Sequence, residues 1–155
     1  MNHSSMAAAI YRRPGELEIA ETPVPTIGPT DALIEVEYCG ICGTDLHMVL
    51  DGWGTPDSIG GHEWSGHVVA AGPDSGVAVG ELVAGNADTT CHECDECRRG
   101  RPSLCTNRGQ AGEDRFQGAF ARYVASRAGA FVPVPDGVDA RSAAYAEPLA
   151  VALHA

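Results

Sequence analysis

Hydrophobic and polar residues alternate along residues 32–39, ALIEVEYC, in a pattern that predicts a strand with one buried face. Ile34, Val36 and Tyr38 share one face of this strand, and two glutamates share the other. Further short strands are predicted at residues 64–71, 77–84, 119–125 and 131–134. Because 19 glycines and 10 prolines favour many turns between short strands, the pattern predicts a mainly β domain with short helices.

Helices are predicted in two parts of the chain. A short helix is predicted over residues 45–50, where Thr44 can act as its N-cap. Near the end of the chain, Asp139 can cap a helix through residues 140–146. A last helix follows, with Glu147 at its cap position and Pro148 as its first residue. Strands first and helices last favour a β-barrel that leads into another structure.

Length and charge limit the classes of function. A chain of 155 residues fits one domain with a substantial core. A net charge of −11 argues against nucleic acid or an anionic membrane surface as a partner. The sequence shows no secretory signal and no run apolar enough to span a bilayer. These features predict a soluble, cytoplasmic protein.

Four cysteines lie in the short segment CHECDECRRGRPSLC, with the spacing C-x2-C-x2-C-x7-C. They are Cys91, Cys94, Cys97 and Cys105. A closed shell of four thiolates is typical of structural zinc, whereas the spacing fits poorly with an iron–sulfur cluster of the bacterial ferredoxin type. Because residues 89–108 lack periodicity, we expect a metal ion to organise this lobe. Thiolates of this kind also indicate a reducing compartment.

A second set of ligand-type residues lies outside this lobe. Cys42, His62 and Glu147 would supply a thiolate, an imidazole and a carboxylate, and a catalytic zinc takes three such ligands and keeps one open position. Each residue also has a simpler interpretation. Cys39 and Cys42 form a CxxC pair that redox chemistry would use, His62 can be a core histidine, and Glu147 can be only a helix cap.

The motifs CGICGTDLH, GGHEWSGHVVAAG, the four-cysteine lobe, GAFARYV and AEPLAVALHA occur in this order. Together they resemble the zinc-dependent medium-chain alcohol dehydrogenases over almost the whole chain. The resemblance implies a GroES-like β-barrel with a zinc-binding lobe, which is the catalytic domain of an oxidoreductase. The pair Glu147-Pro148 resembles the branch of polyol, threonine and sugar dehydrogenases.

The resemblance also implies roles for individual residues. Cys42 and His62 match catalytic zinc ligands, and Glu147 matches the third ligand or a close partner through water. Glu63 matches a carboxylate that enters or leaves the zinc shell. Asp45 matches the acid that orients His62. Thr44 and His47 match a proton relay that also contacts the nicotinamide cofactor. The four lobe cysteines match the structural zinc ligands, and Cys39 has no metal role. The implied reaction is hydride transfer between a small alcohol or polyol and NAD or NADP.

The sequence departs from the family in one respect. No G-x-G-x-x-G motif opens a helix anywhere in the chain. We therefore expect residues 1–155 to be the N-terminal part of a longer dehydrogenase, inactive alone, whose nucleotide-binding domain lies elsewhere. Two alternatives remain: a non-catalytic, zinc-stabilised β-barrel that binds a partner, and a zinc-free quinone reductase of the same superfamily. The family tends toward homo-oligomers, but no pattern in this chain sets an oligomeric state.

Overall fold

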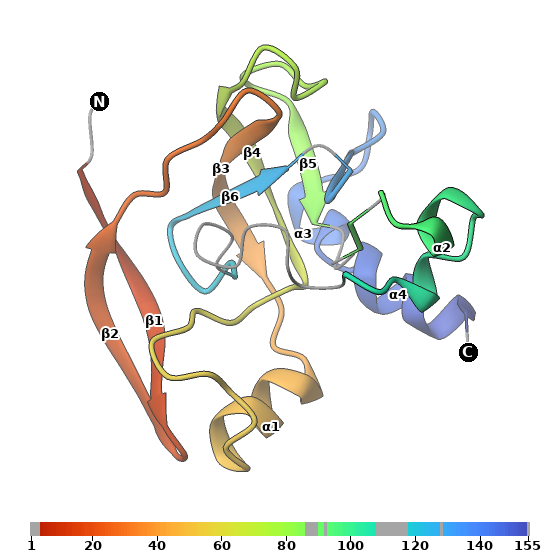
Figure 1. The fold of residues 1–155 in the computed structure, drawn as a ribbon. Coiled ribbons are helices and arrows are strands. Elements are labelled where there is room, and N and C mark those ends of the chain that lie inside the picture. The colour runs from red at the N-terminus through yellow and green to blue at the C-terminus, as the bar shows by residue number, and fades with distance from the viewer. Residues whose placement is uncertain (1–3, 86–89, 92, 108–117, 128, 155) are drawn as a thin grey trace.

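Seven strands form two antiparallel sheets in the computed structural model, which describes residues 4–85, 90–91, 93–107, 118–127 and 129–154. The hairpin sheet consists of β1 (Ser5–Arg13) and β2 (Glu16–Pro23). The five-stranded sheet has the order β6 (Tyr123–Arg127), β3 (Asp31–Cys39), β4 (Trp64–Ala71), β5 (Leu82–Gly85) and β7 (Phe131–Pro133). This second sheet curls strongly, and the prediction of a mainly β domain with short helices is confirmed (Figure 1).

The main core lies against one face of the five-stranded sheet. Ile34, Val68 and Val83 are almost completely buried there. The core cluster consists of Ala32, Ile34, Trp64, Val68, Val83, Ala119, Val124 and Phe131. The alternation in β3 therefore places Ile34 correctly. The expectation for Tyr38 is wrong: the pairing register shifts between Val36 and Tyr38, and this irregularity leaves Tyr38 42% exposed.

The strand predictions differ from the structure mainly at strand ends. The strand predicted at residues 64–71 is confirmed as β4. The strand predicted at 77–84 is shorter, because Gly80 adopts a φ of 94° in a turn before β5 begins. The strand predicted at 119–125 begins later, because Ala119 and Phe120 donate backbone hydrogen bonds to the loop at residues 60–61.

The hairpin of β1 and β2 has no counterpart in the sequence predictions. It joins the rest of the molecule through isolated bridges between Ala8 and Ala121 and between Ile10 and Ile59. Ala8, Ile10 and Ile59 form a second, smaller core cluster. The hairpin therefore packs beside the loop that leads toward β4.

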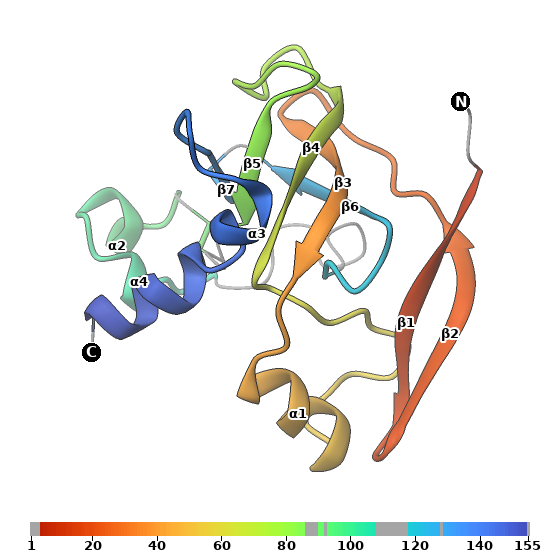
Figure 2. The same ribbon diagram turned by 180° about the vertical axis from the view of Figure 1, so that it is seen from behind.

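Short helices lie at the edges of the sheets. They are α1 (Gly43–Leu50), α2 (Asp95–Arg98), the 3-10 helix η1 (Pro102–Leu104), α3 (Ala140–Ala143) and α4 (Ala146–His154). Asp139 caps α3 as predicted, but the helix ends at Ala143. Helix α4 begins at Ala146, so Glu147 lies in its first turn instead of at its cap. Figure 2 shows α3 against β4 and β5, with α4 leading away.

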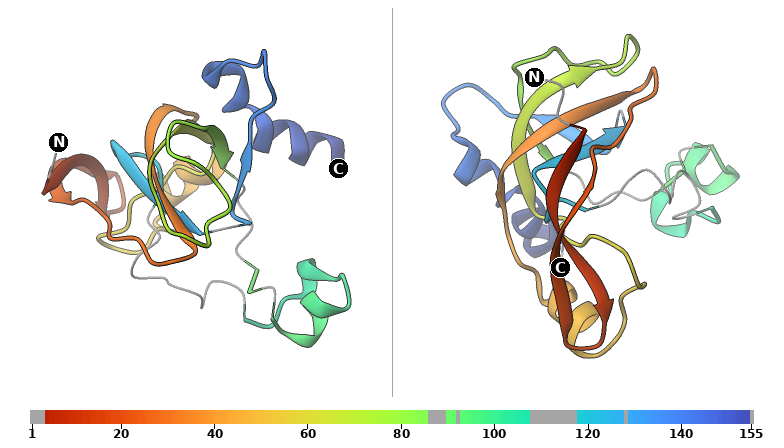
Figure 3. Two further views of the ribbon diagram at one scale, coloured as in Figure 1. Left: turned by 90° about the horizontal axis from the view of Figure 1, so that it is seen from above. Right: turned by 90° about the vertical axis from the view of Figure 1, so that its left-hand side faces the viewer.

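The cysteine lobe projects from the sheets. In both views of Figure 3, the segment with α2 stands apart from the strands. Both ends of the lobe predicted over residues 89–108 lie outside the described residues. Within the described parts of the chain, no helix has the length and apolar character needed to cross a membrane.

Candidate metal centres

The four cysteines of the lobe come together around one point. Cys91, Cys94, Cys97 and Cys105 each offer a sulfur atom, and these atoms all lie within 4.8 Å of one another. Cys105 Sγ lies 3.6 Å from Cys91 Sγ and 4.0 Å from Cys94 Sγ. Four sulfurs at about 2.3 Å from a tetrahedral zinc ion would be ~3.8 Å apart. The spacing of the sulfurs therefore fits zinc.

Backbone amides prepare these sulfurs for a cation. The amide of Cys94 donates to Cys91 Sγ over 3.3 Å, and the amide of Cys91 donates to Cys105 Sγ over 3.4 Å. Hydrogen bonds from the backbone of Cys97 and then of Thr106 lower the pKa of Cys94 to about 5. The pKa of Cys91 is also lowered, first by the backbone of Glu93. Both shifts favour the thiolate, the form that binds metal.

A second group of ligand atoms forms where α1 meets the segment before β4. Cys42, His62 and Glu63 each offer one ligand atom within 4.8 Å of the others, and all three side chains are half-buried. Cys42 is the N-cap of α1, and the other two residues directly precede β4. One thiolate, one imidazole and one carboxylate leave a fourth tetrahedral position open, as in catalytic zinc sites.

Glu147, predicted as the third ligand, does not join this group. It lies half-buried in the first turn of α4, and Glu63 supplies the carboxylate next to Cys42 and His62 instead. Glu63 follows His62 directly, and its carbonyl oxygen accepts a hydrogen bond of 2.7 Å from the amide of Gly40. This bond holds the two ligand segments side by side. A metal-binding role for Glu147 stays a prediction.

Asp45 links the two ligand segments from within the protein. The residue is only 4% exposed. Its carboxylate accepts hydrogen bonds from the amides of Cys42, at 2.9 Å, and Gly61, at 3.2 Å. Its Oδ1 atom also lies 3.7 Å from His62 Nδ1. Asp45 is therefore placed to fix the orientation of the His62 ring.

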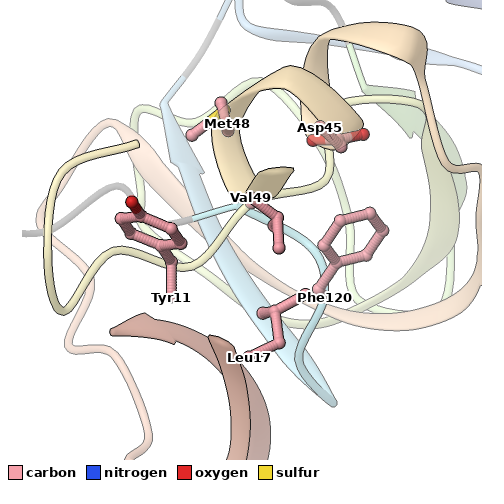
Figure 4. A pocket seen from close by; sticks show the side chains of 7 residues that line it. Tyr11, Leu17, Asp45, Met48, Val49 and Phe120 are labelled. Atoms are coloured by element: carbon pink, nitrogen blue, oxygen red, sulfur yellow. The ribbon is translucent and has the colours of Figure 1, made fainter. Parts of the chain in front are cut away.

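A small apolar pocket separates α1 from the hairpin beside Asp45. Figure 4 shows Met48 and Val49 of α1 across from Leu17 and Phe120. The lining consists of Tyr11, Leu17, Asp45, Met48, Val49, Gly60 and Phe120. The hairpin therefore supports the helix that carries Cys42 at its start.

The two residues of the predicted proton relay lie on α1. Thr44 is not the N-cap, because Cys42 occupies that position and α1 begins at Gly43. Thr44 Oγ1 lies 3.7 Å from Cys42 Sγ. His47 Nδ1 lies 2.6 Å from Asp51 Oδ2, and its ring stacks on Trp53 with 4.7 Å between centroids. The sequence analysis missed Asp51, although a spacing of four residues on a helix is the signal for such a pair.

Cys39 and Cys42 are free thiols and form no disulfide. Burial raises the pKa of Cys39 to about 12, with further contributions from the charges of Asp45 and Glu63. Cys39 packs against the main core cluster. A thiol that keeps its proton is a poor nucleophile, so the redox interpretation of the CxxC pair loses its support.

Residues 28–136 match the model of the alcohol dehydrogenase GroES-like domain. The chain belongs to this family. L-threonine 3-dehydrogenase of Stenotrophomonas maltophilia is 39% identical to this alcohol dehydrogenase GroES-like domain over an alignment of 142 residues. The alignment covers 88% of the chain and 42% of the relative. The chain thus spans less than half the length of this curated relative.

Solved structures resemble this GroES-like domain closely. A candidate zinc-binding dehydrogenase of Sinorhizobium meliloti, bound to NADP, is 36% identical with a TM-score of 0.85 and covers 98% of this chain and 45% of its own. The cobalt- and zinc-bound alcohol dehydrogenase of Pyrobaculum aerophilum is 30% identical with a TM-score of 0.78, covering 92% and 44%.

Proposed function

We propose that this chain is the metal-binding catalytic part of a zinc-dependent dehydrogenase that oxidises a small alcohol or polyol with NAD or NADP. The observation that carries the proposal is the convergence of Cys42, His62 and Glu63 next to a buried Asp45. A structural barrel has no need for this mixed set of donors. The names of the similar proteins, which include a threonine dehydrogenase and an alcohol dehydrogenase, support the same substrate class.

The two groups of ligand atoms would hold two zinc ions with different tasks. The four thiolates of the lobe would hold a structural ion. Cys42, His62 and Glu63 would hold the catalytic ion, and Glu147 remains a further candidate ligand. When bound there, zinc supplies a Lewis acid that makes an alcohol hydroxyl easier to ionise.

The residues of α1 would remove the hydroxyl proton. Thr44 Oγ1 lies beside the sulfur of Cys42, where it can accept that proton from a substrate. His47 is 54% exposed at its side chain, and its Nδ1 atom is held by Asp51. That contact leaves the other ring nitrogen of His47 available to pass a proton to solvent.

The proposal places the nicotinamide site outside residues 1–155. The chain contains no G-x-G-x-x-G motif and spans 42% of the threonine dehydrogenase that it resembles. Hydride transfer would therefore need the longer polypeptide, and this chain alone would bind metal without turnover.

Zinc content and nicotinamide reduction test the proposal. We expect two zinc ions per chain for the unmodified protein, one for Cys42→Ser, and one for Cys97→Ser. We also expect the polypeptide encoded with its downstream sequence to reduce NAD or NADP when given threonine, polyols or secondary alcohols. The metal-stabilised binding module would be favoured instead by two results together. These are one zinc ion per unmodified chain, and nicotinamide reduction by the longer polypeptide that survives Cys42→Ser.

A further inference from the structure

Gly40 lies directly against the side chain that completes the second metal group. Its amide donates to the carbonyl oxygen of Glu63 over 2.7 Å. A Cβ atom on Gly40 would collide with Glu63 Oε2 and would lie 3.2 Å from Glu63 Cβ and 3.4 Å from Glu63 Cδ. The Glu63 carboxylate therefore occupies the space that any other residue at position 40 would fill.

The requirement for glycine here is steric. Gly40 is not among the glycines with positive φ, so an alanine can adopt its backbone conformation without strain. The atom in closest conflict is the far end of a flexible side chain, which can rotate away at small cost. An alanine at position 40 should therefore leave the fold intact and move the carboxylate.

A second glycine in the same CGICG motif provides the comparison. Gly43 lies three positions further on, at the start of α1. A Cβ atom on Gly43 would meet nothing within 4 Å. Gly43 therefore provides a glycine in the same motif whose replacement by alanine adds a Cβ atom without touching Glu63.

We propose that Gly40 is a positioning residue that seats the Glu63 carboxylate beside Cys42 and His62 as the third metal donor. This inference rests on the proposed function, because it assumes that the second group binds a metal ion. Its chemical consequence is a hard oxygen donor beside the sulfur of Cys42 and the imidazole of His62, with the fourth position left open.

Cobalt binding tests the inference without any measurement of turnover. The full chain is first given one equivalent of zinc for the four-thiolate lobe and is then titrated with Co²⁺ as the probe. We expect Gly40→Ala to weaken Co²⁺ binding by about 10- to 100-fold, the usual effect of disturbing the support of a metal ligand. The visible absorption of the bound Co²⁺ should change as well. Gly43→Ala should match the unmodified chain in both respects.

A double-mutant cycle with Glu63→Ala isolates the contact. Once Glu63 has lost its carboxylate, Gly40→Ala should weaken Co²⁺ binding no further. The same cycle in thermal unfolding midpoints covers the case in which Gly40→Ala folds less well, because its effect should then shrink in the Glu63→Ala background, where only the milder contact with Cβ of residue 63 remains. Additive effects in both measurements would overturn the inference.

The outcomes separate this inference from the proposed function. An unmodified chain that takes up no Co²⁺ beyond the zinc-filled lobe defeats both. If the Gly40→Ala variant binds Co²⁺ as tightly as the unmodified chain does, only the role of Gly40 is defeated and the dehydrogenase proposal still stands.

Discussion

Asp45 shows how one buried side chain organises the second metal group. Its carboxylate accepts two backbone hydrogen bonds, one from the amide of Cys42 at the N-cap of α1 and one from the amide of Gly61 in the loop before β4. The donor in that loop is 16 residues away from Asp45 in the chain, so local preference alone cannot align the two segments. The first of these bonds, from the amide of Cys42 to the carboxylate of the N3 residue Asp45, is the capping-box contact at the start of α1.

Replacing Asp45 by alanine should therefore damage both stability and metal binding. Each amide that loses its buried acceptor costs about 1–3 kcal/mol, and a loosened His62 should weaken binding of the second ion by about 10- to 100-fold. Zinc titration and chemical unfolding measure the two effects. Asp51→Ala is the control, since Asp51 lies at the other end of α1 and contacts His47. Equal zinc affinity in Asp45→Ala would contradict the assigned role.

Cys39 should resist alkylation in the folded protein. Its pKa is raised from 9.0 to about 12, mainly by burial, so almost no thiolate exists near pH 8. Mass spectrometry after iodoacetamide treatment should find Cys39 unmodified in the native chain and modified after denaturation. Rapid labelling of the native chain would show that this thiol is accessible and ionised.

The same shift predicts a loss of stability in alkali. Between pH 9.0 and about 12 the folded chain keeps the Cys39 proton that the unfolded chain releases. The contribution of the Cys39 thiol to the free energy of unfolding is therefore fully present below pH 9, and it is lost as the pH rises through this window. The thermal midpoint of the unmodified chain should fall relative to Cys39→Ala as the pH rises above 9. A constant difference would contradict the shift.

At the scale of elements, the residue pattern predicted those strands and helices whose signals lie in their own sequence or directly beside it. Strand β4 matches the predicted residues 64–71 at both ends, and the Gly-Gly pair at residues 60–61 is the local turn signal that precedes it. The hairpin has no counterpart in the predictions, although residues 16–19 of β2, ELEI, alternate between polar and apolar; the three alanines after Met6 give β1 no comparable period. Tertiary contacts with residues 59 and 121 stabilise its pairing, and no local signal reports such contacts.

Helix α3 depends on its cap more than on its four residues. Asp139 Oδ1 accepts a hydrogen bond of 2.7 Å from the amide of Ser142. This bond is the largest of the causes that lower the pKa of Asp139. Ala140, the first residue of α3, accepts a hydrogen bond from the buried hydroxyl of Ser65 on β4. The cap therefore helps to hold the segment that leads to α4.

Asp139→Ala should lower the thermal midpoint at pH 7, whereas Asp139→Asn should lower it less because the amide oxygen can still accept a hydrogen bond. The pKa of Asp139 is lower in the folded state, so its contribution is complete above the ordinary value of 3.8. That contribution is lost as the pH falls through the folded value. The difference between the unmodified chain and Asp139→Ala should thus shrink as the pH falls below 3.8. A difference that does not change with pH would rule out the charged cap.

At the scale of the whole molecule, the sequence identified candidate site residues more successfully than it predicted which of them lie close together. The spacing of the four lobe cysteines was enough to group them, because all four lie in one short segment. The second group needs Cys42 and His62 to meet across a long stretch of chain, and only the resemblance to a family indicated that meeting. The sequence alone gave no means of seeing that Glu63 lies with Cys42 and His62, because that placement depends on tertiary contacts such as the close approach of Glu63 to Gly40.

The lobe and the curled sheet should respond separately to the loss of metal. Helix α2 packs mainly against η1 inside the lobe, whereas the strands of the five-stranded sheet pack against one another. At the base of the lobe, Arg127 of β6 donates to the carbonyl oxygen of Thr90. The lobe has no buried side chain in α2 or η1, so the four thiolates and their ion must supply most of its stability.

Removal of that ion should therefore unfold the lobe and leave the barrel folded. In hydrogen exchange measured by mass spectrometry, Cys97→Ser should remove protection from residues 93–107 and preserve it in β3 and β4. Cys42→Ser is the matched control, because it removes a thiolate from the other group and should leave the lobe protected. Loss of protection throughout the sheet in Cys97→Ser would mean that the lobe and the barrel fold as one cooperative unit.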